Sequence, residues 1–325
     1  MAQVTDAIPL QQSRKRLPWG VLTIPLLLAA ATAASFLGSQ WWVFECLAHF
    51  RPHWAVLSLL VLLWSIVRRV PFAVVIAFAC LVPNVVPLTP YLLARSAAPD
   101  LPRSVRVMNV NLHGDTNVLP KLKALIAQEQ PDIVLLTEVP PTVPAVPMTL
   151  FPDYPETLFS QRGAFEVMVL SRWTIKGPHF DRTVAQQLPV LSAELCDPAN
   201  PSVCLALIGL HGARPFGATV AMRDAQLRRA AQLAFARGDL PVLLMGDLNV
   251  TPWSPLFSQL LADGELRDAS LARGLTATWP SACLLCGVLI DHVLVSPKIT
   301  VLGSRVAADI GSDHRPVLAD LALRP

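Results

Sequence analysis

Three apolar stretches that end before residue 94 are the strongest constraint on how this chain folds. Residues 19–37 contain no charged side chain and reach about the 20 residues that a membrane-spanning helix needs. Residues 54–67 are fewer, but Trp54 and the pair Arg68 and Arg69 are suited to anchor the two ends at membrane interfaces. Residues 70–93 are long enough to span, and prolines near their end predict that the helix stops there. We therefore predict an all-α transmembrane region of three helices at residues 19–93.

Basic residues set the expected orientation of these helices. Arg14, Lys15 and Arg16 precede the first stretch, and Arg68 and Arg69 lie between the second and the third. All five fall on one side of a membrane only if every stretch crosses, and the positive-inside rule makes that side the cytoplasm. Residues 1–18 are then a cytoplasmic tail and the C-terminal region is extracytoplasmic. If the second stretch did not cross, that region would be cytoplasmic.

Other interpretations explain less of the apolar pattern. A signal peptide would account for the first stretch alone, and no small-residue cleavage site stands out. Core helices of a soluble protein would be patterned by polar residues. Transporter helices would carry charges inside the stretches, and these carry none. The pattern favours an anchor.

The remainder of the chain has an ordinary globular composition. The whole chain is 53% hydrophobic and 15% charged, but nearly all of the excess lies before Leu93. The net charge of +3 is small, and no dense run of lysine and arginine follows Arg103. Because nucleic-acid binding requires a clustered basic surface, the composition gives it no support.

Four cysteines form two closely spaced pairs. Cys196 and Cys204 flank a turn-rich loop between two apolar runs, so they could face each other across a hairpin, and Cys283 and Cys286 form the second pair. Two such pairs are typical of an oxidising compartment. The alternatives are four buried thiols or a metal site in a reducing compartment, although a zinc site more often needs all four ligands to converge.

After a linker at residues 94–102, strands and helices interleave through residues 103–325. Strands are predicted at residues 105–112, 133–137, 165–170, 188–195, 203–210, 242–246, 289–296 and 317–321. Helices are predicted at residues 118–130 and 219–237, with Arg223, Arg228 and Arg229 on the solvent side of the second. The prolines after Val139 predict an irregular loop. Interleaved strands and helices indicate an α/β sandwich.

Polar side chains gather where the predicted strands begin or end. Asn111 ends the first strand, Glu138 follows the second and His211 follows a later one. The other members of the set are Asp247, Asn249, Asp291, Asp313 and His314. Carboxylate and amide oxygens suit a hard cation such as Mg²⁺, and histidines beside carboxylates supply a base or a phosphate contact. The pattern predicts a site along one rim of a sheet.

The order of these motifs resembles the endonuclease/exonuclease/phosphatase superfamily. The likeness rests on Asn111, Glu138 in LLTEV, His211, GDLN at residues 246–249, IDHVLVS at residues 290–296 and GSDHRPV at residues 311–317. This superfamily includes deoxyribonuclease I-like nucleases, apurinic endonucleases, sphingomyelinases and inositol-polyphosphate phosphatases. The resemblance covers residues 103–325 and implies a four-layer α/β sandwich, in which two packed mixed sheets are flanked by helices.

The resemblance also implies a role for each residue. Glu138 is expected to be the main ligand of a Mg²⁺ or Mn²⁺ ion, with Asn111 and Asp313 helping to hold it. Asp291 is expected to orient His314, which acts as a general base or contacts the phosphate. Asp247 would position the attacking water, and Asn249 and His211 would bind the scissile phosphate.

Each of these residues also has a structural interpretation, as a cap, a turn former or a solvated side chain. His113 and His292 adjoin motif positions and are left outside the predicted catalytic set. Arg214 and Arg223 are either phosphate ligands or solvated side chains, with the second interpretation favoured. Trp279 either walls off the substrate or belongs to the core.

The resulting hypothesis is a multi-pass enzyme of a bacterial cell membrane that hydrolyses a phosphodiester, a phosphomonoester or a lipid-linked pyrophosphate. Its tether makes a lipid-linked phosphate a reasonable substrate. One alternative is a nuclease acting on nucleic acid. Another, from a different class, is an inactive binding or scaffold module, which the intact motifs disfavour. No obligate protein partner is evident.

Overall fold

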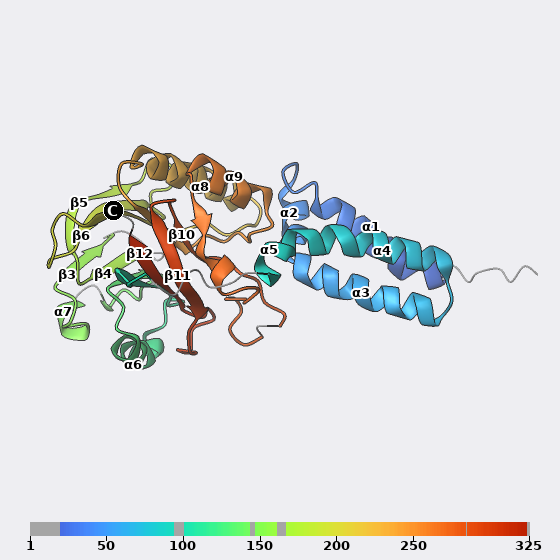
Figure 1. The fold of residues 1–325 in the computed structure, drawn as a ribbon, viewed down its shortest axis with the longest axis horizontal. Coiled ribbons are helices and arrows are strands. Elements are labelled where there is room, and N and C mark those ends of the chain that lie inside the picture. Colours follow the sequence, from blue (N-terminus) through green and yellow to red (C-terminus); the bar gives the residue numbers. More distant parts are fainter. Residues whose placement is uncertain (1–19, 94–100, 144–146, 161–166, 284, 324–325) are drawn as a thin grey trace, which may run out of the picture.

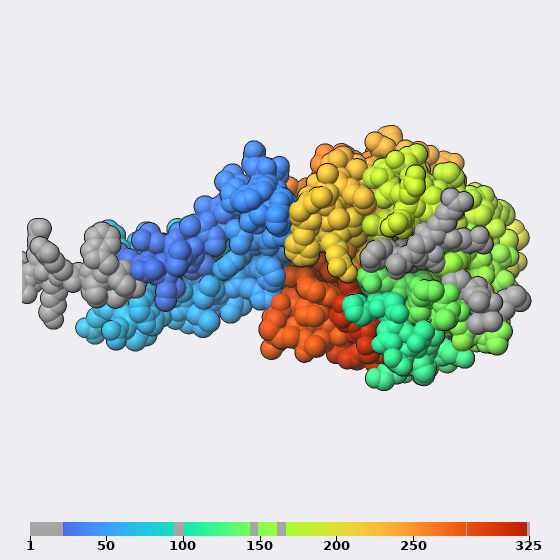
Figure 2. All heavy atoms as spheres, turned by 180° about the vertical axis from the view of Figure 1, so that it is seen from behind, coloured from blue at the N-terminus to red at the C-terminus, as the bar shows by residue number. Residues whose placement is uncertain are grey.

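The chain folds into a helical part and an α/β part, which lie end to end (Figure 1). The structure is a computed structural model and describes residues 20–93, 101–143, 147–160, 167–283 and 285–323. Figure 2 shows the same division from behind, with a narrow helical rod seated against a broad globular body. The predicted cytoplasmic tail and most of the predicted linker lie outside the described residues.

The helical part is a bundle of three long helices with two short ones at its junction with the α/β part (Figure 1). The long helices are α1 (Gly20–Ser35), α3 (Arg51–Val67) and α4 (Pro71–Val85), and the short ones are α2 (Trp42–His49) and α5 (Thr89–Leu92). A 3₁₀ turn, η1 (Val86–Leu88), links α4 to α5. The α-helix therefore ends in the proline-containing segment where the sequence predicted that it would stop. The turn between α3 and α4 lies at the end of the bundle away from the α/β part.

One continuous helical segment, Pro71–Leu92, is long and apolar enough to cross a membrane. The pair α2 and α3, bent by 66°, meets the same requirement only if it counts as one span, and Leu22–Ser35 is apolar but shorter. Within the described residues, one of the three predicted crossings therefore has a helix of sufficient length and apolarity.

The bundle is apolar on the outside, and many of the side chains buried where its helices meet are small or polar, beside apolar ones such as Leu28 and Val61. Leu27, Val67 and Phe72 are 65%, 78% and 72% exposed. By contrast, Ala77 and Ser58 are fully buried where the long helices meet. Small residues at helix contacts and apolar residues facing outward are the arrangement of helices packed in lipid. In water, the same exterior would be an unusually large apolar surface.

The α/β part contains two six-stranded sheets (Figure 1). The first has the order β11-β12-β1-β2-β4-β3, and the second has the order β5-β6-β7-β8-β10-β9. In each sheet the two central strands run parallel, β1 with β2 and β7 with β8, while the other pairs are antiparallel. The bounds in the first sheet are β1 (Val105–Asn111), β2 (Ile133–Thr137), β3 (Glu156–Phe159), β4 (Val167–Ser171), β11 (Ile299–Val306) and β12 (Val317–Leu323). Those in the second are β5 (Thr174–Asp181), β6 (Val190–Cys196), β7 (Cys204–His211), β8 (Val242–Asp247), β9 (Arg267–Asp268) and β10 (Asp291–Val295).

The two sheets pack face to face and are covered by helices on their outer faces. Apolar side chains of both sheets, including Leu135, Leu207 and Met245, form the central core. Helix α6 (Leu119–Glu129) packs on the first sheet, and α8 (Thr219–Ala236) with α9 (Pro255–Asp263) packs on the second. Strands buried on both faces read as continuous apolar runs, which explains why the central strands were recognisable. The predicted four-layer sandwich is confirmed.

Every predicted strand is present, and four strands were not predicted. The missed strands are β3, β5, β9 and β11. They lie at or next to sheet edges, where β5 is largely exposed and carries neither an alternating nor a continuous apolar pattern. The missed helix α9 is short and begins where the hydroxyl of Ser254 accepts a hydrogen bond from the backbone of Leu256. The loop predicted after Val139 contains a single helical turn, α7 (Pro147–Leu150).

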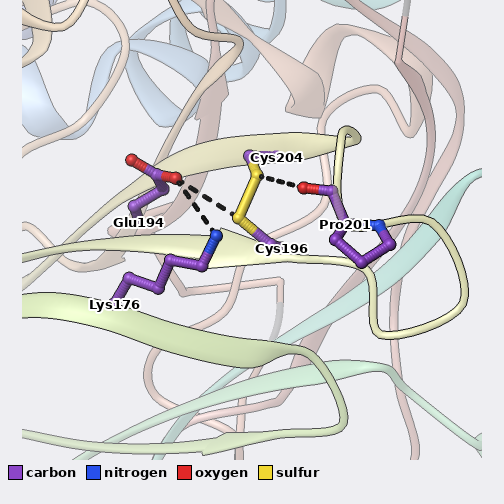
Figure 3. The surroundings of a disulfide bond; sticks show 5 residues. All are labelled: Lys176, Glu194, Cys196, Pro201 and Cys204. Carbon is purple, nitrogen blue, oxygen red and sulfur yellow. Dashed lines mark hydrogen bonds and ion pairs between the residues drawn. A yellow bond between two sulfur atoms is a disulfide. The ribbon is translucent and has the colours of Figure 1, made fainter.

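Both cysteine pairs form disulfide bonds. Cys196 and Cys204 are register partners across the hairpin of β6 and β7, where Figure 3 shows their bond beside the carboxylate of Glu194. The same carboxylate lies 4.0 Å from Nζ of Lys176. Cys283 and Cys286 close a short loop before β10. The hairpin interpretation of the first pair is therefore confirmed.

Helix α2 joins the helical part to the α/β part through a buried ion pair. Oε2 of Glu45 lies 2.5 Å from Nη2 of Arg223 on α8, and the hydroxyl of Ser254 donates to Oε1 of Glu45 at 2.6 Å. Arg223 is fully buried, so the prediction that it lies on the solvent side of its helix is wrong. The reason is that α2 covers this face, which the sequence of α8 alone does not reveal.

Replacing Glu45 with glutamine is expected to destabilise this junction. The substitution keeps the shape of the side chain but leaves Arg223 buried beside Asp224 alone, which we expect to lower the free energy of unfolding by about 3 kcal/mol. The measurement is the midpoint of thermal unfolding of the detergent-solubilised chain. A second substitution, Arg223→Gln, should recover part of the loss. Glu265→Gln, at an exposed position, is the control, and equal midpoints for both glutamate variants would contradict the role of the ion pair.

Candidate active site

The two pairs of parallel strands, β1 with β2 and β7 with β8, end in polar side chains that lie at the same rim of the sandwich. Asn111 is the last residue of β1, and Glu138 directly follows β2 beside it. His211 and Asp247 are the last residues of β7 and β8 and are register partners. Because parallel strands end at one edge of their sheet, packing the two sheets brings these four side chains together.

The glycine of the GDLN motif permits the close approach of β7 and β8 at this rim. A Cβ atom on Gly246 would lie 1.9 Å from the carbonyl oxygen of Leu210, a distance that no larger residue tolerates. Two residues later, the backbone N–H of Asn249 donates to Oδ1 of Asp247 at 3.0 Å. This turn fixes the Asp247 carboxylate and directs the Asn249 side chain toward the carbonyl of Gly212 at 2.8 Å.

A single amide links the acidic groups of the two sheets. Nδ2 of Asn111 donates to Oε1 of Glu138 at 3.1 Å and to Oδ2 of Asp247 at 3.0 Å. Nε2 of His211 lies 3.5 Å from the same oxygen of Glu138 and 3.6 Å from the same oxygen of Asp247. Two carboxylates therefore converge on a buried amide and an imidazole.

A buried carboxylate orients the histidine of the last motif. Nδ1 of His314 lies 2.9 Å from Oδ2 of Asp291, and Nε2 lies 3.7 Å from Oδ2 of Asp247. The loop that carries His314 is tied to β1, because the hydroxyl of Ser312 donates to the carbonyl of Asn111 at 2.7 Å. The carboxylate partner fixes which nitrogen of the ring faces Asp247.

Burial and neighbouring charges shift the protonation of this cluster. Burial raises the pKa of Asp247 to about 7 despite the opposing charge of His314. Burial alone would lower the pKa of His314, but the carboxylates of Asp291 and Asp247 outweigh it and raise that pKa to about 10. Burial also opposes ionisation of Asp291, yet the charge and hydrogen bond of His314 lower the pKa of that carboxyl. Burial lowers the pKa of His211 to about 4, so its ring is neutral near pH 7.

The cluster opens into a pocket of about 420 Å³ that also contains Asp313 and Asn249. Oδ2 of Asp313 accepts a hydrogen bond from Nε1 of Trp279 at 3.1 Å, and Oδ1 lies 3.1 Å from Nδ1 of His113. Trp279, for which the sequence left two interpretations, therefore lines the pocket. The half-exposed His113, which was left outside the predicted set, also lines it. Its position two residues after the end of β1 was the available signal for His113. His292 lies outside the pocket, buried, with Nε2 2.8 Å from the carbonyl of Val250.

The helical part supplies one wall of this pocket. Cys46, His49 and Phe50 line it from α2 and the residue that follows. Nδ1 of His49 lies 2.9 Å from the hydroxyl of Thr251, in the loop after β8. The sequence gave little signal for these residues, because they fall between two apolar stretches and far from every motif.

The structure gathers all eight predicted site residues around one pocket, and their chemistry fits a divalent cation. Four carboxylates converge there, from Glu138, Asp247, Asp291 and Asp313. Among the described residues that line the pocket, Arg214 is the only lysine or arginine, and its side chain is exposed. One oxygen or nitrogen from each of Glu138, His211 and Asp247 lies within 4.8 Å of the others, which suits ligands of one ion. The excess negative charge and the oxygen-rich donor set are those that a hard divalent cation prefers.

Solved structures with this fold come from several kinds of enzyme. An endonuclease/exonuclease/phosphatase from Beutenbergia cavernae is 22% identical, with a TM-score of 0.56 over 69% of this chain and 72% of that chain. TDP2 from D. rerio, complexed with a single-strand DNA product, is 19% identical, with a TM-score of 0.55 over 67% and 98%. A mannosyl-6-phosphatase from Bacteroides thetaiotaomicron is 18% identical, with a TM-score of 0.55 over 68% and 100%. No match was found among curated proteins.

The sequence profile of the Endonuclease/Exonuclease/phosphatase family matches residues 108–314, which include every motif of the site except the last residues of the final one. The match covers well over half of the chain and includes all eight residues at the rim. This chain therefore belongs to the Endonuclease/Exonuclease/phosphatase family and is a metal-dependent hydrolase of phosphoester bonds.

Proposed function

We propose that the chain is a membrane-anchored phosphoesterase whose active site works on the outer surface of a bacterial cell membrane. Its substrate is a phosphodiester, a phosphomonoester or a lipid-linked pyrophosphate. The observation that carries the proposal is the buried convergence of Glu138, His211 and Asp247 in a pocket walled by the helical part. In this proposal residues 1–18 are a cytoplasmic tail, residues 19–93 the anchor, residues 94–102 a linker and residues 103–325 the catalytic domain.

In the proposed site, Glu138, Asn111 and Asp313 hold the cation, which is Mg²⁺ or Mn²⁺. When bound, the cation supplies positive charge that offsets the negative charge of the phosphate oxygens. The position of Asn111 supports this assignment, because its side chain lies within hydrogen-bond distance of both Glu138 and Asp247. Its Oδ1 accepts a hydrogen bond from the backbone N–H of His113 at 2.9 Å, which holds the side chain in place.

The remaining residues position the water and the phosphate. Asp247 orients the attacking water and takes its proton, a role suited to a carboxylate whose pKa burial raises to about 7. Asp291 holds His314 so that its Nε2 faces the pocket, where it contacts the phosphate. The neutral ring of His211 and the amide of Asn249 donate to the phosphate oxygens, which gain negative charge as the water attacks.

The helical part supports the anchor and its orientation. Its outward side chains are apolar, small side chains such as Ala77 are buried between its helices, and the turn with Arg68 and Arg69 lies at the end away from the catalytic domain. Three crossings would place that turn in the cytoplasm and the domain outside it. The two disulfides agree with an oxidising location for the domain.

Two related structures make nucleic acid the main alternative substrate. The D. rerio TDP2 structure contains a single-strand DNA product, and a 3′ phosphatase from Neisseria is bound to a product DNA hairpin. In this chain, Arg214 is the only lysine or arginine among the described residues of the pocket. A nucleic-acid backbone needs several such contacts, so we favour a lipid-linked substrate.

Loss of either proposed key group is expected to abolish hydrolysis. Glu138→Ala removes the main metal ligand and His314→Ala removes the oriented imidazole, and each should lower kcat by about a hundredfold or more. The measurement uses the full chain in nanodiscs with Mg²⁺ and a panel of aryl phosphate monoesters, aryl phosphodiesters, DNA, a phosphoinositide, a sphingomyelin and a lipid pyrophosphate. His179→Ala, an exposed histidine on β5, is the control. Hydrolysis that survives either site substitution would refute the proposed roles.

Removing divalent cations is expected to have the same effect on the unmodified chain. Chelation should abolish hydrolysis because the carboxylates of the pocket then have no divalent cation to offset their repulsion of the phosphate. Adding Mg²⁺ or Mn²⁺ in excess of the chelator should restore the rate. Full activity after exhaustive dialysis against chelator would contradict a metal role for Glu138.

The proposed topology has a direct test. A reporter enzyme that is active only in the periplasm, fused after Pro325, should be active because three crossings place the C-terminus outside the cytoplasm. The same reporter fused after Arg69, in the turn between α3 and α4, should be silent. A silent reporter after Pro325 in a well-expressed fusion would contradict the three crossings.

A further inference from the structure

A second cavity lies beside the catalytic pocket, between α3 and the segment that precedes β10. Its volume is about 450 Å³, within the range of pockets that bind small molecules. Side chains from both sides make its lining apolar. They include Val56, Leu57, Leu60, Leu275, Leu285 and Leu289.

This second cavity, which we call the apolar groove, adjoins the catalytic pocket and shares a wall with it. Val288 lines both spaces and pairs with Trp279, whose indole N–H reaches Asp313 in the catalytic pocket. Trp253, which also lines the groove, forms a second link. Its indole N–H donates a hydrogen bond of 2.9 Å to the backbone carbonyl of His49, which lines the catalytic pocket. A molecule that fills both spaces would pass Val288.

On its other side, the groove opens onto the exposed outer surface of α3. Val56 and Leu60, on the outward side of α3, are 59% and 58% exposed. Leu285 is 94% exposed, and its carbonyl lies 3.1 Å from Nε2 of His53 near the start of α3. The Cys283–Cys286 disulfide closes the loop that presents Leu285. In the proposed membrane setting, this face of α3 is covered by lipid.

We propose that this groove holds the hydrocarbon tail of a lipid-linked phosphoester whose phosphate lies in the catalytic pocket. The inference rests on the proposed function and names its substrate class. Three observations support a tail as the occupant: the lining is apolar, the groove begins on the exposed apolar face of α3, and it ends beside the pocket that contains Glu138 and His314. A volume of about 450 Å³ suits one tail more than a pair.

The test separates the tail from the phosphate by keeping the scissile bond constant. The full chain in nanodiscs receives p-nitrophenyl phosphodiesters whose second ester group is methyl, octyl or hexadecyl. In each, water attacks phosphorus, the bond to the aryl oxygen breaks, p-nitrophenolate leaves and an alkyl phosphate remains. Hydrolysis of the methyl diester reports on the proposed function, and the ratio of hexadecyl to methyl reports on the groove.

A matched pair of variants on α3 distinguishes the groove from simple partitioning into lipid. Leu60→Trp fills the groove, while Leu59→Trp adds the same bulk at the neighbouring exposed position outside it. We expect Leu60→Trp to lower kcat/KM for the hexadecyl diester about tenfold and to leave the methyl diester unchanged. Leu59→Trp should change neither. Leu285→Glu, which places a charge beside the tail path, should repeat the selective loss if Leu60→Trp folds poorly.

Binding provides a readout that does not depend on turnover. An alkyl phosphate with a photoreactive diazirine in its chain should label residues 56–60 and 285–289 of the unmodified chain more strongly than α1 or α4. Equal labelling of all bilayer-facing helices would overturn the proposal, as would equal loss of methyl and hexadecyl hydrolysis in Leu60→Trp.

Discussion

The site depends on the packing of two sheets whose parallel central strands end at the same rim. Asn111 comes from one sheet and Asp247 from the other, and the amide of the first contacts the carboxylate of the second at 3.0 Å. Neither sheet alone brings the proposed metal ligand Asn111 and the proposed water-orienting group Asp247 together. The apolar core between the sheets sets their separation, so the free energy of burying residues such as Leu135 and Leu207 also fixes the geometry of the catalytic groups. A shift of one residue in β8 would turn Asp247 away from Asn111.

Much of the fold and most of the site could be predicted from the sequence, for physical reasons. Central strands such as β2 and β8 are buried on both faces and are nearly continuous apolar runs. The polar residues that end or follow these two strands stand out against the runs, which is why Asp247 and Glu138 were identifiable. Assigning a role to each still required the family resemblance, because strand ends alone do not distinguish a ligand from a cap.

The remaining features depend on contacts between distant segments. Strand β5 is exposed at a sheet edge, so it carries no strong pattern. The burial of Arg223 and the entry of His49 into the pocket both follow from the docking of α2 on the loop after β8, some 200 residues further along the chain. Glu45 and His49 showed no pattern that pointed to partners so remote. Tertiary contacts of this kind are visible only once the two parts are placed together.

The ion pair of Glu45 and Arg223 has a consequence for where the enzyme can work. Because α2 is held to the α/β part by a buried charge pair, the pocket that α2 lines is held at a fixed height beside the junction end of the helical bundle. In the proposed setting, such an enzyme samples only the thin layer of molecules that shares this height. Encounters then occur by lateral diffusion in two dimensions, and the surface density of the substrate governs the rate in place of its bulk concentration.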